Sequence, residues 1–245
     1  MNKFLSLKEL STNQADQYNQ AKTKAFPPVI NESQTIKAYW DRMETYFPEY
    51  QHFLIGSEDE LIGFINMIPF HFGQPLSELP DRGWDWMLEK SIYDYESKVA
   101  PNYLGALQVI VRKNYQNQGY SKKILSQAKQ FMRDSKFQNL IIPIRPTLKH
   151  LHPTVPMEEY LKLKDDGKAY DPWVRTHING GAQIIKVCNQ SMTVEGELNM
   201  WESILGYKVV ESGEYILKGA LRPIVIDIEN NTGQYLEPNV WVKYD

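Results

Sequence analysis

The fold is decided by the stretch from Val109 to Leu125, which reads VIVRKNYQNQGYSKKIL. Its first residues, Val109 to Val111, are β-branched and apolar, as is typical of a buried strand. A polar turn follows, and after Gly119 the apolar residues recur at the spacing of one helical face. A strand that enters a helix through such a turn leaves backbone N–H groups without partners at the helix start. Together with the helix dipole, these donors predict an anion-binding site.

The sequence around this stretch predicts a βαβ unit. A strand at 103–111, a helix at about 118–135 and a short apolar strand at 139–144 follow one another. If the two strands pair, we expect them to be parallel with a right-handed crossover. Further elements are predicted as helices at about 12–24, 33–46, 81–98, 171–179 and 195–205, and as strands at 3–7, 52–56, 61–72 and 182–194.

No linker or repeat divides the chain, which predicts one α/β domain over residues 1–245. Within it, the aromatic-rich segment at about 73–100 is interpreted as an insertion between strands. Residues 208–245 are interpreted as a C-terminal β extension.

The composition narrows the classes of protein that fit. The chain has 27 basic and 30 acidic residues and a net charge of −3, which argues against nucleic-acid binding through bulk charge. The single cysteine, Cys188, excludes an intramolecular disulfide, fits a reducing compartment, and is interpreted as a small buried apolar residue. The N-terminus shows no signal-peptide pattern, and no run approaches the roughly 20 apolar residues of a membrane span. We therefore expect a cytoplasmic protein without a membrane partner.

His150 and His152 lack further ligand residues nearby, so we predict no metal site.

The turn resembles the phosphate-binding turn of the GCN5-related N-acetyltransferase (GNAT) superfamily, Arg/Gln-x-x-Gly-x-Gly/Ala. Gln116, Gly119 and Ser121 occupy the three motif positions, with serine in place of the last small residue. Val109-x-Val111 and Tyr115 also match the usual run from the central strand into the turn. The resemblance implies a mixed central sheet with splayed central strands, flanked by helices.

The resemblance also implies acetyl-CoA or another acyl-CoA as co-substrate. Backbone N–H groups of the turn would hold its pyrophosphate, and Lys122 would add positive charge. The exposed backbone of Val109 and Val111 would pair with the pantetheine amides. The implied cofactor-binding residues are Val109, Val111, Gln116, Asn117, Gln118, Gly119, Tyr120, Ser121 and Lys122. The alternative is an ordinary βα turn whose glycine serves packing alone.

A later segment, His177-Ile178-Asn179-Gly180-Gly181-Ala182, resembles the family's Tyr-x-x-x-Gly-Phe. His177 stands where the family's tyrosine often protonates the departing CoA thiolate, and histidine is able to move protons near neutral pH. The alternative is a histidine that only forms hydrogen bonds within the fold. The family's common carboxylate on the central strand would fall near Gly105, where this chain has none. Glu96 or Asp81 is able to substitute, although nothing singles either out.

His177 together with Thr147 is similar to the GNAT-like loading domains of polyketide synthases, which decarboxylate malonyl-CoA or transfer an acyl group to a carrier protein. This resemblance implies catalytic roles for His177 and Thr147 and a pocket position for Trp40. The alternative for Thr147 is a turn residue after Pro146.

We therefore predict an acyltransferase, foremost an acetyltransferase, with an unidentified small-molecule, amine or thiol acceptor. Two other functions stay open. One is a non-catalytic acyl-CoA-binding protein, and the other is a malonyl-CoA decarboxylase or S-acyltransferase. Possible partners are a small-molecule acceptor, a carrier protein and a second copy in a homodimer.

Overall fold

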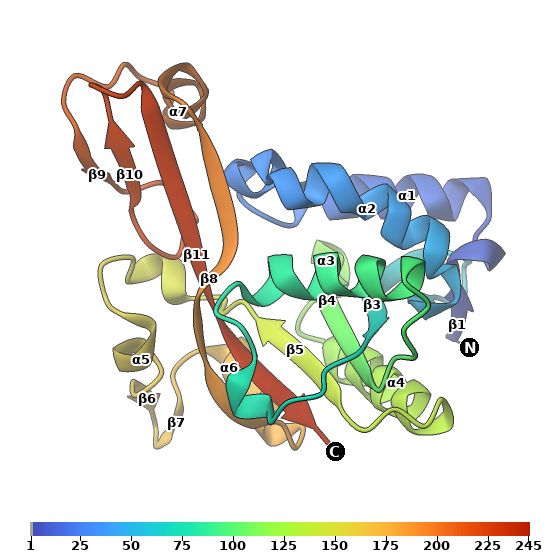
Figure 1. The fold of residues 1–245 in the computed structure, drawn as a ribbon. Helices are drawn as coiled ribbons and strands as arrows, with labels where there is room; N and C mark the ends of the chain where they lie inside the picture. Colours follow the sequence, from blue (N-terminus) through green and yellow to red (C-terminus); the bar gives the residue numbers. More distant parts are fainter. Residues whose placement is uncertain (1) are drawn as a thin grey trace.

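The computed structural model describes residues 2–245 and is drawn in Figure 1. Its helices are α1 (Thr12–Lys24), α2 (Gln34–Tyr46), α3 (Gly83–Glu96), α4 (Tyr120–Asp134), α5 (Met157–Tyr160), α6 (Pro172–Asn179) and α7 (Leu198–Leu205). Its strands are β1 (Lys3–Ser6), β2 (Gln51–Ile55), β3 (Leu61–Phe70), β4 (Tyr103–Val111), β5 (Leu140–Ile144), β6 (Lys164–Asp165), β7 (Lys168–Ala169), β8 (Gln183–Glu197), β9 (Gly213–Tyr215), β10 (Ile224–Asp227) and β11 (Thr232–Tyr244).

The main sheet has the strand order β1-β2-β3-β4-β5-β11-β10-β9, and β8 pairs with β11 along its other edge. The β4–β5 pair is parallel, whereas the other pairs of this sheet are antiparallel. The predicted βαβ unit is therefore present as β4–α4–β5. This confirms the predicted α/β class with a mixed central sheet.

Helices cover both faces of this sheet (Figure 1). The apolar residues of α2 and α3 share one core with Ile68, Leu107 and Trp241 of the sheet. The apolar face of α4, together with Val174 of α6, packs on the opposite face in a second core. α1 covers the sheet beside α2 and contributes Tyr18 to a third cluster. The space beside β4 is therefore bounded by α1, α2 and α3 on one side and by α4 and α6 on the other.

Side-chain caps explain where several helices begin. Ser11 and Ser33 accept hydrogen bonds from the backbone in the first turns of α1 and α2. Asp171 does the same for α6 and is followed by Pro172 at the first helical position, as predicted. The Gly180-Gly181 pair ends α6.

The C-terminal half differs from the sequence prediction in one place. β8 continues to Glu197, past the predicted end at residue 194, because its last residues pair with Thr232 to Gln234 of β11. The two long strands, β8 and β11, extend past β5, and α7, β9 and β10 lie at their far end, at the upper left of Figure 1. The segment at 73–100, interpreted as an insertion, holds α3, which packs against α2 and β8. None of the described helices is both long and apolar enough to span a membrane.

Candidate functional site

The turn between β4 and α4 has the backbone that an anion site requires. Asn117 and Gly119 have positive φ angles of 61° and 80°. Gln116 fixes the turn to the preceding strand, because its side-chain amide donates to the carbonyl of Val111 at 3.0 Å. A Cβ on Gly119 would meet no atom within 4 Å, so the space beside the turn is open. Glycine is favoured there by its φ rather than by crowding within the chain.

The N-terminus of α4 is uncapped. Gly119 offers no side chain as a cap, and the first turn contains no acidic residue. The first helical N–H groups, those of residues 120–122, have no partner within the helix. Lys122 and Lys123 are exposed at this end, where the helix dipole disfavours cations. An anionic group would satisfy the free donors and offset both charges.

β4 separates from β5 after Gly105, six residues before β4 ends at Val111. The parallel pairing covers only Leu104↔Leu140 and Gly105↔Ile141. Beyond Gly105, β4 pairs with β3 alone, and the edge that faces β5 stays open as far as Val111. A bulge at Leu107 accompanies the separation, because Asn66 pairs with Gln108 whereas Met67 pairs with Ala106. The predicted splayed central strands are therefore present, and they form an open backbone edge that ends at the turn.

His177 lies in α6 and is almost completely buried, with 1% of its surface exposed. Its Nδ1 lies 2.8 Å from the hydroxyl of Tyr244, and its ring packs edge-on against Trp173. Burial lowers the pKa of His177 to about 3, so the imidazole is neutral at neutral pH. No partner for Nε2 is present among the described residues. An unpaired polar atom in a buried position is unfavourable and is a feature of functional sites.

Thr147 lies at the other end of α6. Its hydroxyl is 3.4 Å from the carboxylate of Asp171, the N-cap residue of that helix. His177 follows six residues after Asp171, about 9 Å along the helix axis at the usual rise per residue. α6 thus carries His177, and Thr147 contacts the N-cap residue of the same helix from the segment after β5, but no hydrogen bond joins the side chains of Thr147 and His177.

Trp40 lies near the bulge of β4. Its ring stacks on that of Trp84, with the centroids 6.3 Å apart and the planes 4° from parallel. Trp84 in turn donates its indole N–H to the carbonyl of Leu107 at 2.8 Å. This pair of indoles therefore connects α2, through α3, with the point where β4 and β5 separate.

Comparison with known proteins agrees with this geometry. Residues 15–152 match the model of the acetyltransferase (GNAT) family. The chain belongs to the GNAT acetyltransferase family. An arginine N-acetyltransferase, avaD of Aspergillus versicolor, is 30% identical over 89% of this chain and 84% of that protein. Membership confirms the predicted enzyme class, an acyltransferase, and the acyl-CoA co-substrate that the turn implied.

Solved structures show the same fold. The GNAT-like loading domain of CurA from Lyngbya majuscula has a TM-score of 0.61 at 17% identity, and the alignment covers 100% of this chain and 98% of that chain. The GphF GNAT-like decarboxylase, solved with isobutyryl-CoA, has a TM-score of 0.56 at 12% identity, with 100% and 98% covered. At these identities the likeness establishes the fold and not the reaction.

In this GNAT chain, a core side chain of α3 occupies the space beside Gly105, the position where the resemblance led us to look for a carboxylate. A Cβ on Gly105 would lie 2.6 Å from the sulfur of Met87, on α3. The two carboxylates that the sequence offered in its place, Glu96 and Asp81, each lie at the surface beside a basic side chain. Glu96 forms an ion pair with Arg42, and Asp81 lies 3.3 Å from Lys186.

Sequence reasoning missed a buried acid in the first turn of α3. Asp85 is 2% exposed and accepts the backbone N–H of Thr193 at 2.8 Å through Oδ2, whereas no described residue bonds Oδ1. Burial raises the pKa of Asp85 to about 7. The available signal was an acidic residue between two tryptophans, Trp84 and Trp86, at a helix start.

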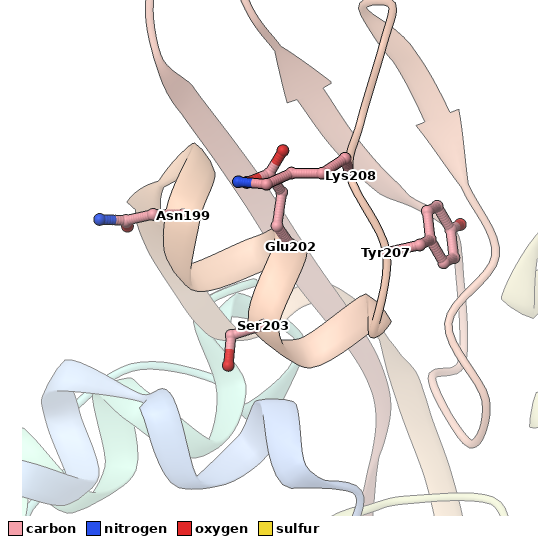
Figure 2. Close-up of a pocket in the computed structure, with 5 residues that line it drawn as sticks. All are labelled: Asn199, Glu202, Ser203, Tyr207 and Lys208. Carbon is pink, nitrogen blue, oxygen red and sulfur yellow. The ribbon is translucent and has the colours of Figure 1, made fainter.

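Other features of the chain do not form a comparable site. The hollow in Figure 2, about 350 Å³, is lined by Asn199, Glu202, Ser203, Tyr207 and Lys208 on and after α7, at the end of the C-terminal extension away from β4. The Cys188 thiol is buried, which raises its pKa to about 12 and leaves it unreactive. Residues 2–245 contain no cluster of three or more side chains able to hold a metal ion.

Proposed function

We propose that this GNAT acyltransferase transfers the acetyl group of acetyl-CoA to the amino group of a small molecule, arginine or a related amine. The observation that carries the proposal is the uncapped N-terminus of α4 next to the open edge of β4. The helix start suits a pyrophosphate and the strand edge suits an extended chain of amides, and the two follow one another along the chain.

The proposed cofactor contacts follow from these two features. The backbone N–H groups from Gln118 to Lys122, with the Lys122 ammonium, hold the pyrophosphate at the turn. The backbone of Val109 and the N–H of Val111 pair with the pantetheine amides as an added strand would, while the Val111 carbonyl is held by Gln116. Val109 and Val111 belong to the half of β4 that has no partner in β5, which supports this assignment.

In the proposed reaction, the acceptor nitrogen attacks the thioester carbonyl, a C–N bond forms and the C–S bond breaks. His177 donates a hydrogen bond from its Nε2–H to the departing thiolate. Because the pKa of His177 is lowered to about 3, this donor is the neutral imidazole. The hydroxyl of Tyr244, 2.8 Å from Nδ1, favours the tautomer that carries its proton on Nε2. The proton that the attacking nitrogen releases reaches the thiolate through solvent, so that the products are the amide and free CoA thiol.

Thr147 and Trp40 are proposed to contact the substrates. Thr147 is exposed beyond the end of β5 and orients the acyl group or its carbonyl. Trp40, stacked on Trp84, forms an apolar wall on the acceptor side of β4. The nature of the acceptor is supported by the relative that is 30% identical, an arginine N-acetyltransferase.

Two measurements test the proposal. Calorimetry with CoA should detect binding, and mass spectrometry should detect an acetylated product after incubation with acetyl-CoA and L-arginine or a panel of amines. CoA binding without any product would favour the alternative of a non-catalytic acyl-CoA-binding protein. Release of CO₂ from malonyl-CoA, or acylation of a carrier-protein thiol in place of an amine, would favour the loading-domain activities. No binding at millimolar CoA would reject the proposal as a whole.

A further inference from the structure

The bulge in β4 brings a polar side chain to the acceptor side of the splayed strand. Because Leu107 has no counterpart in β3, it and the next residue, Gln108, both face the helices α1 to α3. Val109 returns to the opposite face and packs under α4. Gln108 is half-buried, and its side chain lies beside that of Asn66, its partner in β3.

Hydrogen bonds fix the orientation of the Asn66 amide from one side. The side-chain nitrogen of Gln51 donates to the main-chain carbonyls of Phe47 at 2.7 Å and Met67 at 2.9 Å. Carbonyl oxygens only accept, so this end of Gln51 must be its NH₂ group. The other end, Oε1, therefore accepts, and Asn66 Nδ2 donates to it at 2.8 Å.

A second chain of hydrogen bonds fixes the same orientation from α2. The Glu44 carboxylate accepts hydrogen bonds from the hydroxyl of Tyr18 at 2.6 Å, from the indole of Trp40 at 2.7 Å and from the ammonium of Lys22 at 3.0 Å. Burial and the neighbouring Glu44 raise the pKa of Tyr18, so its phenol keeps its proton and donates it. The phenol oxygen is left to accept from Asn66 Nδ2, at 3.1 Å.

These two chains determine which atom of Gln108 is free. Both N–H groups of Asn66 are used, so its Oδ1 is the acceptor, and Gln108 Nε2 donates to it at 2.8 Å. Gln108 Oε1 therefore points away from Asn66, and no donor within residues 2–245 bonds it. The result is a carbonyl oxygen of fixed orientation at the point where β4 leaves β5.

We propose that Gln108 Oε1 accepts a hydrogen bond from the attacking amino group of the acceptor, and that Asn66, anchored by Gln51 and Glu44, fixes its orientation. This inference rests on the proposed N-acetyl transfer. An amide oxygen holds an N–H and directs the nitrogen lone pair toward the thioester, but it does not take up a proton. Gln108 is thus a positioning residue and not a base.

The absence of a base here has a consequence for the substrate class. The site suits an amino group that is already partly neutral at physiological pH. An α-amino group, with a pKa of about 8, meets this condition, whereas a guanidinium, with a pKa above about 12, does not. With an acceptor such as arginine, acetylation is therefore expected on the α-amino nitrogen.

Steady-state kinetics with L-arginine, or with the best amine of the panel, tests the assignment. Gln108→Met keeps the length of the side chain but removes the oxygen, and the loss of one hydrogen bond should raise the acceptor KM about tenfold. The affinity for CoA, measured by calorimetry, should not change. Asn66→Asp cannot donate to Gln51 or Tyr18, so it disturbs the orientation of Gln108 and should change the acceptor KM in the same direction. Gln108→Glu restores an acceptor oxygen and should recover part of the loss.

The control is Gln183→Met, an exposed glutamine at the start of β8, which should leave both KM values unchanged. Circular dichroism and CoA binding establish that each variant is folded. Product fragmentation should place the acetyl group on the α-nitrogen. An acceptor KM that is the same in Gln108→Met and the wild type overturns the assignment, as does a product acetylated on the guanidinium. A wild-type protein that binds CoA but acetylates none of the amines overturns the proposed N-acetyl transfer itself, and the role of Gln108 with it.

Discussion

A Cβ atom on Gly105 would lie 2.6 Å from the sulfur of Met87. The side chain of Met87, on α3, therefore occupies the space into which a side chain at this position of β4 would project. A larger residue at position 105 requires the end of the Met87 side chain to move.

This contact predicts a coupled pair of substitutions. Gly105→Ala should lower the free energy of unfolding by about 1–3 kcal/mol through overpacking. Met87→Ala should lower it by about 2–5 kcal/mol through the cavity it leaves. In the double variant the new methyl group occupies part of that cavity, so the combined loss should be smaller than the sum of the two. Urea denaturation of the four proteins measures the coupling, and strictly additive losses would show that the two residues do not compete for space.

Gly119 should be required for CoA binding. Gly119→Glu places a carboxylate beside the predicted pyrophosphate and strains a φ of 80° by about 1–2 kcal/mol. We expect the CoA affinity measured by calorimetry to fall by about tenfold or more, since like charges repel at this site. Gly206→Glu is a matched control, because Gly206 has a φ of 81° and open space around its Cβ position, at the end of α7. An equal effect of both variants on CoA affinity would contradict a local role of the turn.

Asp85 should make the stability of the protein depend on pH. Burial raises its pKa in the folded state to about 7, from the ordinary value of 3.8. Between these values the unfolded chain releases a proton that the folded chain keeps, so stability falls as the pH rises through this window. Relative to Asp85→Asn, the wild type should lose roughly 1 kcal/mol per pH unit between about pH 4 and pH 7. Urea midpoints of both proteins at several pH values measure the difference, and a difference that does not vary with pH would refute the shift.

His177 should affect turnover more than binding. If its Nε2–H donates a hydrogen bond to the departing thiolate, His177→Phe should lower kcat by about a hundredfold or more, with an unchanged affinity for CoA. His177→Gln still presents an N–H group and should retain more activity than the phenylalanine variant. Because the pKa of His177 lies at about 3, kcat should show no inflection from this residue near neutral pH. Thiol release from acetyl-CoA measures these rates. Equal rates in the wild type and His177→Phe would leave His177 a structural role alone.

Much of the fold follows from local sequence signals. The run VIV before the turn, the glycine with a positive φ and the amphipathic helix after it predicted β4, the turn and α4 within a few residues, because each signal acts over a few neighbouring residues. The Asp171-Pro172 start and the Gly180-Gly181 end of α6 are also local. The end of β8 was predicted too early, because its last residues are held by β11, some 35 positions later in the chain.

The residues of the candidate site also fall into two groups, those predicted by local sequence signals and those brought together by tertiary contacts. By itself, the sequence determined the strand, the glycine turn and the helix that follows it, and with them the family, since these signals are local. Only the tertiary structure decided that Met87 fills the space at Gly105, that Asp85 is buried, and that the amide nitrogen of Gln108 is bonded to Asn66. These features depend on burial and on the direction of hydrogen bonds between residues as far apart in the chain as Glu44 and Gln108. No periodicity along the chain encodes the burial of a polar residue or the direction of such hydrogen bonds.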